Sequence, residues 1–154
     1  PHTVSLTSAV CALTTHFLGS KVREEWEALG SLGSPNLETI QRRVGKGPSV
    51  ILGEWEGEWL AREGALKLME MARLPVRAFG SEEFYHGPRH SVAAGDPIWH
   101  MSVAKDRRNT EIEAAYRFHV SGATPLAWVP ALVEMQWAAL AVAANLGVDP
   151  DLKA

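Results

Sequence analysis

The stretch EGALKLMEMARLPVRAFGSEEFYHGPRH, residues 63–90, sets the architecture because a helical pattern, a strand and a histidine loop follow one another in it. With 100° of rotation per residue, Glu63, Lys67 and Glu70 fall within about 60° of one another on one helix face. His86 follows in a loop whose Gly87 and Pro88 cannot continue a helix. A charged helix face thus lies close in sequence to a histidine.

Predicted strands and helices alternate on both sides of this stretch. Strands are expected at 49–54, 76–79, 97–104 and 117–122, and helices at 6–30, 37–44, 57–74, 108–115 and 125–147. Pro130 should kink or delay the first turn of the last helix, and Gly147 should end it. The Gly/Ser/Pro-rich segment 30–36 is the best candidate for a linker. This alternation predicts an α/β fold with a parallel sheet and helices on both faces.

The composition fits one domain of ordinary globular type, with 46% hydrophobic and 21% charged residues among 154. A net charge of -3 with scattered basic residues argues against a nucleic-acid partner. The single cysteine, Cys11, cannot form an intramolecular disulfide, and we expect a reducing, cytoplasmic setting. No apolar run approaches the ~20 residues that span a bilayer, and the start lacks the charged region of a signal peptide, so no membrane partner is expected.

Two interpretations of the charged helix face remain open. Glu63, Lys67 and Glu70 could form a surface ion-pair ladder worth a few tenths of a kcal/mol. Alternatively, the apolar neighbours on both shoulders could shelter them as a site, since a solvated ladder rarely needs such flanks. The flanking residues are Trp59, Leu60, Leu66 and Leu74, and the small residues Ala61, Gly64, Ala65, Leu68 and Ala72 are expected to face the sheet. Glu58, Arg62 and Arg73 form the stripe expected to face solvent.

His86 lies just beyond a predicted strand, where parallel α/β sheets place their ligand sites. A histidine there suits proton transfer, although a surface hydrogen bond is the simpler role. Glu82 and Glu83 could orient His86 or solvate the loop. His86 and His90 with a glutamate invite a metal site, but the Gly87-Pro88 break removes regular ligand spacing and no third ligand is evident. We expect no metal and no cofactor.

Two segments are candidates for an anion site. The turn GEWEGEW, residues 53–59, is not a phosphate cradle, because its three glutamates would repel an anion. The start of the helix at 6–30, with Thr7 and Ser8, is a better anion site, or else a simple N-cap. His2, His16, His100 and His119 are expected to be structural, and Trp128 and Trp137 to lie in the core.

The segments LGEWEGEWLAREGALKLME (52–70) and AFGSEEFYHGP (78–88) resemble the sugar-isomerase (SIS) domain family, with its motifs E-G-A-L-K-x-K-E and E-x-x-H-G-P. Weaker matches are TVSLTSAVCALTTHFL (3–18) and ANLGVDPD (144–151). The chain resembles in particular the isomerase part of glucosamine-6-phosphate synthase and related double-SIS phosphosugar isomerases, deaminases and deglycases. The resemblance implies a flavodoxin-like, three-layer α/β/α sandwich. It also implies that residues 1–30 belong to a preceding SIS half, 31–48 to a linker with a short helix, and 49–154 to a second SIS domain.

The resemblance also implies residue roles. Glu70 would be the base that moves a proton between C1 and C2 of an opened sugar phosphate or aminosugar phosphate, supported by Glu63 and Lys67. His86 would open the sugar ring, offered from the second subunit of a homodimer. The implied substrate-binding residues are Val4, Ser5, Thr7 and Glu83. The expected activity is a metal-independent phosphosugar isomerase or aminosugar-phosphate deaminase/deglycase acting through an enediol(ate).

This sequence departs from the family pattern at several positions. Met69 replaces the second lysine of the helix motif, Trp55 replaces a small glycine, and Leu6 replaces a serine. The serine-rich phosphate loop of the first SIS half is absent from these 154 residues, and Lys153 does not align with the substrate-contacting lysine of the synthases. These departures favour an alternative, a sugar-phosphate-binding SIS module that regulates without chemistry. A fragment with only a structural, dimer-forming role is a third hypothesis.

Overall fold

The computed structural model describes residues 12, 16, 36–103, 113–120 and 125–151. Most of the helix predicted at 6–30 lies outside the described residues, as do Val4, Ser5 and Thr7. The helix predicted at 108–115 lies outside them except for residues 113–115, which are not helical. Their backbone already runs beside the neighbouring strand, since the amide of Ala115 donates to the carbonyl of Ile98 at 2.8 Å.

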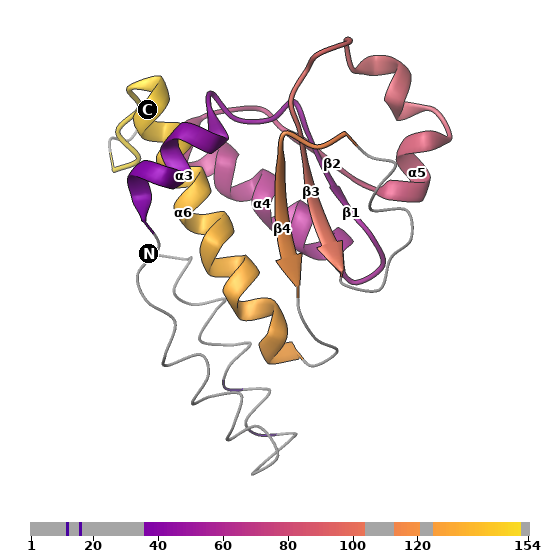
Figure 1. Cartoon of the computed structure of the whole chain (residues 1–154), viewed down its shortest axis with the longest axis horizontal. Coiled ribbons are helices and arrows are strands. Elements are labelled where there is room, and N and C mark those ends of the chain that lie inside the picture. The colour runs from indigo at the N-terminus through magenta and orange to yellow at the C-terminus, as the bar shows by residue number, and fades with distance from the viewer. Residues whose placement is uncertain (1–11, 13–15, 17–35, 104–112, 121–124, 152–154) are drawn as a thin grey trace.

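Within the described residues, four parallel strands form the sheet, in the order β2-β1-β3-β4 (Figure 1). They are β1 (Val50–Gly53), β2 (Arg77–Gly80), β3 (Ile98–Val103) and β4 (Tyr116–Val120). Gly53, the last residue of β1, pairs with Gly80 and with Met101, so the carboxyl ends of three strands lie at one edge. The predicted parallel sheet is therefore confirmed, and all four predicted strands are present within one or two residues.

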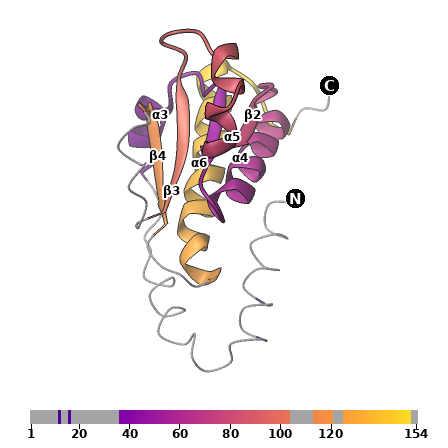
Figure 2. The same cartoon turned by 90° about the vertical axis from the view of Figure 1, so that its right-hand side faces the viewer.

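Helices cover both faces of the sheet. They are α3 (Leu37–Val44), α4 (Gly57–Ala72), α5 (Ser81–Tyr85) and α6 (Val129–Leu146), with short 3-10 turns η2 (Pro88–Ser91) and η4 (Pro125–Trp128). Ile51 of β1 packs in the core with α4 and α6, whereas Val50 and Leu52 pack on the other face with Phe84 of α5. The three predicted layers are thus present, and Figure 2 views them with the α5 side of the molecule toward the reader.

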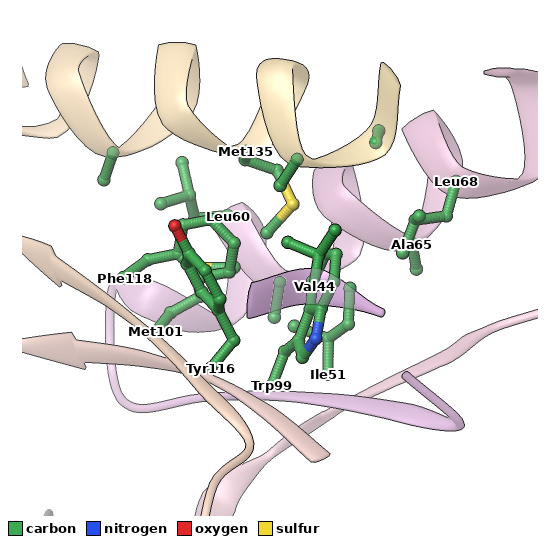
Figure 3. Packing of buried hydrophobic residues seen from close by; sticks show 14 of the residues in the cluster. Val44, Ile51, Leu60, Ala65, Leu68, Trp99, Met101, Tyr116, Phe118 and Met135 are labelled. Atoms are coloured by element: carbon green, nitrogen blue, oxygen red, sulfur yellow. The ribbon is translucent and has the colours of Figure 1, made fainter. Parts of the chain in front are cut away.

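The main core lies between the sheet and the helices α4 and α6. Trp99 and Met101 of β3 and Tyr116 and Phe118 of β4 project into it (Figure 3). The rings of Tyr116 and Phe118 lie 4.7 Å apart between centroids. Gly64 lets α4 lie close to α6, because a Cβ at this position would be only 2.7 Å from Cε of Met135 on α6. The small sheet-facing residues predicted for this helix are confirmed.

Helix α3 packs as part of this domain. Asn36 caps it, since its Oδ1 accepts a hydrogen bond from the amide of Thr39 at 3.0 Å. Ile40 and Val44 lie in the same core as the strands. The predicted short helix is therefore confirmed, and it contributes to the core instead of only joining two parts of the chain.

Helix α6 begins after the 3-10 turn η4, with Pro130 in its first turn, so the predicted delay of this helix is confirmed. Gly147 ends it with a positive φ of 68°. The prediction that no apolar run is long enough to span a bilayer was wrong for the segment Leu126–Leu146, which passes by length and composition because it is a core helix: 61% of its most apolar 18-residue window is buried inside the fold. Its position in the core accounts for its apolar composition, as the sequence predicted for Trp128.

Candidate functional site

The charged face of α4 is centred on a buried lysine. Lys67 is only 2% exposed, and its Nζ lies 2.5 Å from Glu70 Oε2 and 3.6 Å from Glu63 Oε1. The side chains of Glu63 and Glu70 are 14% and 43% exposed, respectively. The ammonium is therefore held inside while the carboxylate of Glu70 remains accessible from solvent.

A second ion pair on α4 shows what a solvated pair looks like. Glu58 and Arg62, spaced i and i+4, lie at 2.5 Å with side chains 37% and 66% exposed. This is the solvent stripe that the sequence predicted. The burial of Lys67 does not fit the alternative of a surface ladder and favours the sheltered interpretation.

The apolar flanks of the charged face shelter it only in part. Trp59, Leu66 and Met69 are each between 40% and 45% exposed. Trp59 packs against Trp128, with ring centroids 5.7 Å apart, so this shoulder of α4 is tied to the start of α6. The outer side of α4 therefore presents exposed apolar side chains next to Glu70.

His86 does not share this face. It is exposed and ends α5, with its amide donating to the carbonyl of Glu83 at 3.1 Å. Helix α5 packs through Phe84 on the opposite side of the sheet from α4. The short helix α5 was not predicted, because five residues are too few for a recognisable period. Within one chain, His86 and Glu70 thus belong to different layers.

Sequence reasoning missed a buried polar cluster that joins the carboxyl ends of β1 and β2 to the middle of β3. Its centre is His100, which is 0% exposed and was predicted only to be structural. Arg117 donates to His100 Nδ1 at 2.8 Å, and His100 Nε2 lies 3.5 Å from Ser81 Oγ and 3.9 Å from Glu54 Oε1. Polar residues directly after two adjacent strands were the available signal.

The tautomer of His100 follows from its partners. Because an arginine can only donate, Nδ1 accepts and the proton of the neutral ring lies on Nε2. Burial, followed by the charges of Arg117 and His119, lowers the pKa of His100 from 6.5 to about 4. His100 is therefore neutral at pH 7. It cannot remove a proton from Ser81, since its Nε2 already carries one, so this cluster is not a hydrolytic triad.

A pocket of about 340 Å³ opens beside this cluster, at the carboxyl ends of β1 and β2. Its lining includes Glu54, Trp55, Glu58, Ser81, Glu82 and Glu83. Within the part of the chain that the structure describes, no group of three or more His, Cys, Asp or Glu side chains is arranged to hold a metal ion. Among the predicted site residues that the structure describes, only Glu83 lines this pocket.

Comparison with known proteins relates this chain to enzymes of sugar-phosphate metabolism. No protein-family model matches the sequence. A probable glutamine–fructose-6-phosphate aminotransferase (isomerizing) of Acanthamoeba polyphaga mimivirus is 25% identical over 127 residues, covering 66% of this chain and 21% of that protein. The chain thus spans about a fifth of that relative.

Solved structures share the fold. The C-terminal domain of glucosamine-fructose-6-phosphate aminotransferase from Francisella tularensis superposes with a TM-score of 0.58 and 19% identity, covering 75% of this chain and 42% of that one. A glucose-6-phosphate isomerase-like protein from Thermus thermophilus superposes with a TM-score of 0.52 and 18% identity, covering 75% of this chain and 43% of that one. Glucosamine-6-phosphate deaminase from Thermotoga maritima superposes with a TM-score of 0.51 and 19% identity, covering 82% of this chain and 41% of that one. The described part of the chain therefore has the fold of a sugar-isomerase (SIS) domain, the family that its helix and histidine motifs resemble.

Proposed function

We propose that this chain carries the proton-transfer face of an enzyme that acts on a sugar phosphate or aminosugar phosphate, as an aldose–ketose isomerase or a deaminase/deglycase. The observation that carries the proposal is the position of Lys67, buried and within 2.5 Å of the half-exposed carboxylate of Glu70. Burying a lysine costs folding free energy unless an opposite charge pairs with it. Here the paired group is a carboxylate that an external molecule can reach. The names of the similar proteins supply the substrate class.

Glu70 is proposed as the base. Its carboxylate takes the proton from the carbon next to the carbonyl of the opened sugar, and the C–H electron pair forms the C=C bond of an enediol(ate) while the π pair of the carbonyl moves to its oxygen. Glu70 then returns the proton to the former carbonyl carbon, and the hydroxyl proton of the other carbon passes to the former carbonyl oxygen, so that aldose and ketose interconvert without a net change in atoms. Lys67 fixes the position of Glu70, since the N–O distance of 2.5 Å leaves the carboxylate little freedom.

His86 is proposed as the ring-opening residue, working in the site of a second subunit. The placement of α5 and α4 on opposite faces of the sheet supports this, because a site that uses both residues needs two chains. The exposure of His86 leaves it free to enter a neighbouring site. Thr7 with the Val4-Ser5 backbone is proposed to line the sugar and the phosphate of the substrate, as the family resemblance implies.

Substitution of Glu70 by Gln in the full-length protein tests the proposal. The variant keeps the size of the side chain but removes the base, so interconversion of glucose 6-phosphate and fructose 6-phosphate, or turnover of glucosamine 6-phosphate, should fall by about 10²–10⁴-fold. Binding of the same sugar phosphates, measured by calorimetry, should be largely retained.

Glu38→Gln is the matched control, because Glu38 is an exposed glutamate on a different helix, α3. It should leave turnover unchanged. If Glu70→Gln turned over these substrates as fast as Glu38→Gln does, the assignment of the base would be wrong.

A second candidate function is a sugar-phosphate sensor without chemistry. Met69, 45% exposed on the same helix, favours it, since the family motif has a lysine at this position. Binding of a sugar phosphate with no hydrogen exchange at C2 in heavy water, followed by NMR, would support the sensor. Exchange at C2 would exclude it.

A further inference from the structure

The outward side of α4 carries large apolar side chains that the described fold leaves uncovered. Trp59, Leu66 and Met69 are 40%, 42% and 45% exposed, and they make up half of the six exposed large hydrophobic residues in the described part of the chain. Leu68, two residues after Leu66 and about 160° away around the helix, is fully buried. Leu66 therefore points almost directly away from the core.

Opposite charges lie on the two sides of Leu66 along this face. Arg62 is about one helical turn before Leu66 and Glu70 about one turn after it, and at 100° per residue the three fall within about 80° of one another. The side chains of Arg62 and Glu70 are 66% and 43% exposed, respectively. We call Trp59, Arg62, Leu66, Met69 and Glu70 the outer stripe of α4.

The order of charges along the outer stripe is self-complementary. When two copies of α4 lie antiparallel about a two-fold axis through Leu66, residues equally far before and after Leu66 face each other. Arg62 then faces Glu70 of the second copy, and the same pair forms again on the other side of the axis. In a parallel arrangement, Arg62 would face Arg62 and Glu70 would face Glu70, so like charges disfavour it.

The partners that Arg62 and Glu70 have within the chain leave room for these contacts. Arg62 pairs with Glu58 in an exposed i, i+4 bridge, and its guanidinium has further N–H groups that can donate to a second carboxylate. Glu70 binds Lys67 through Oε2, while 43% of its side chain stays open to solvent. Both residues can thus bind a second copy without losing the pairs already formed.

We propose that the outer stripe of α4 binds the same stripe of a second copy, antiparallel and with Leu66 at the two-fold axis. Leu66, Trp59 and Met69 lose contact with water, and two Arg62–Glu70 pairs fix the register. One helix face is small beside the roughly 1,200–2,000 Å² of a stable interface, so the association is weak and depends on concentration.

The contact covers Glu70 and therefore regulates the proposed proton-transfer site, a consequence that rests on the proposed function. Arg62 of the second copy occupies the side of the carboxylate that a sugar phosphate has to reach. Self-association and substrate binding at Glu70 thus exclude each other. The contact also differs from the subunit contact proposed for His86, because α5 and α4 lie on opposite faces of the sheet.

Disulfide trapping of the full-length protein tests the contact, in a background in which Cys11 and any other cysteine are replaced by Ser. Leu66→Cys places a thiol at the two-fold axis, where it meets the same thiol of the second copy, so mild oxidation should give a covalent dimer. Leu146→Cys is the matched control, because Leu146 is also an exposed leucine, 37% exposed at the end of α6. The control should crosslink about tenfold more slowly or less, since its thiols meet only by collision.

Arg62→Glu in the Leu66→Cys protein tests the register. The new carboxylate would face Glu70 of the second copy, so the rate of crosslinking should fall about fivefold, as for like charges a few ångströms apart in water. High salt should reduce this difference, because the charges are exposed.

Two results would overturn the proposal: crosslinking of Leu66→Cys no faster than that of Leu146→Cys, or a rate that Arg62→Glu leaves unchanged. If Leu66→Cys does not fold, as judged by circular dichroism, Arg62→Glu alone carries the test in sedimentation velocity. It should lower the average mass at high protein concentration, and a mass equal to that of the wild type would contradict the contact. None of these measurements depends on turnover, so they distinguish a failure of this contact from a failure of Glu70 as the base.

Discussion

Lys67 and Glu54 are both buried charges, but their surroundings differ. Lys67 is 2% exposed and has two carboxylates within 3.6 Å, both from its own helix. Glu54 is 5% exposed, and its Oε1 accepts no hydrogen bond from the described residues and lies 3.9 Å from the neutral His100. The same degree of burial therefore accompanies a satisfied charge at one site and an unsatisfied charge at the other.

This difference separates two uses of a buried charge. At Lys67 the fold itself completes the ion pair, so the lysine can fix Glu70 in place for proton transfer. At Glu54 the described residues leave one carboxylate oxygen, Oε1, without a hydrogen-bond donor. Burial alone thus does not show whether a charge is stabilised in the fold, and its hydrogen-bond and ion-pair partners do.

The largest expected effect is on the pH dependence of stability, through His100, the neutral neighbour of Glu54. Because the pKa of His100 is lowered to about 4, the unfolded chain binds the proton first as pH falls, and the folded state loses stability between pH 6.5 and 4. The shift corresponds to roughly 3 kcal/mol of unfolding free energy at pH 4. Urea denaturation at pH 7 and pH 4 should show a smaller loss in His100→Gln than in the wild type. Equal losses would mean that His100 is not held neutral.

The second largest effect is expected when Lys67 is removed from its ion pairs. Lys67→Met leaves Glu63 and Glu70 without their shared partner, and we expect a loss of about 2–3 kcal/mol in the free energy of unfolding. This is less than the roughly 3–5 kcal/mol of a fully buried pair, because Glu70 is 43% exposed. Chemical denaturation measures this change in the free energy of unfolding. A loss smaller than that of an exposed ion pair would show that Glu63 and Glu70 do not stabilise Lys67.

Removing the unsatisfied charge should have the opposite sign. Glu54→Gln removes the charge of a buried carboxylate whose Oε1 lacks a donor, so the free energy of unfolding should rise by about 1 kcal/mol. The same denaturation experiment applies. A destabilisation as large as that of Lys67→Met would indicate that Glu54 has a partner in the folded chain.

The smallest effect is expected at the solvated pair on the same helix. Arg62→Ala removes the partner of Glu58, and the loss should be only about 0.3–0.5 kcal/mol, as for other exposed i, i+4 pairs. This loss should disappear in high salt, because the pair is exposed. A loss comparable to that of Lys67→Met would remove the contrast between the two pairs.

Much of the fold could be predicted because its elements are long or strongly patterned. The buried strand β1, the helix α4 with its small sheet-facing residues, and the late start of α6 at Pro130 all follow from local pattern. Helix α5 was missed because five residues show no period. The proximity of Lys67 to Glu63 and Glu70 followed from helical spacing, but the burial of Lys67 depends on how the helix packs.

The cluster around His100 could not be predicted, for a physical reason. Glu54, Ser81 and His100 come together only because β1 lies between β2 and β3, and the strand order is not encoded in any local pattern. The sequence shows that Glu54 and Ser81 each follow a predicted strand, but it does not show that the two strands end side by side at one edge of the sheet. For the same reason, the sequence could not place His86 and Glu70 in different layers.

The proton-transfer role of Glu70 is tested most directly with glucose 6-phosphate carrying deuterium at C2, incubated in ordinary water with the full-length protein and followed by NMR. The wild type should transfer the label to C1 or release it to the water, and Glu70→Gln should leave it at C2 while still binding the sugar phosphate. Loss of the label at the same rate in both proteins, or retention by a wild type that binds the sugar phosphate, would contradict the proposed role.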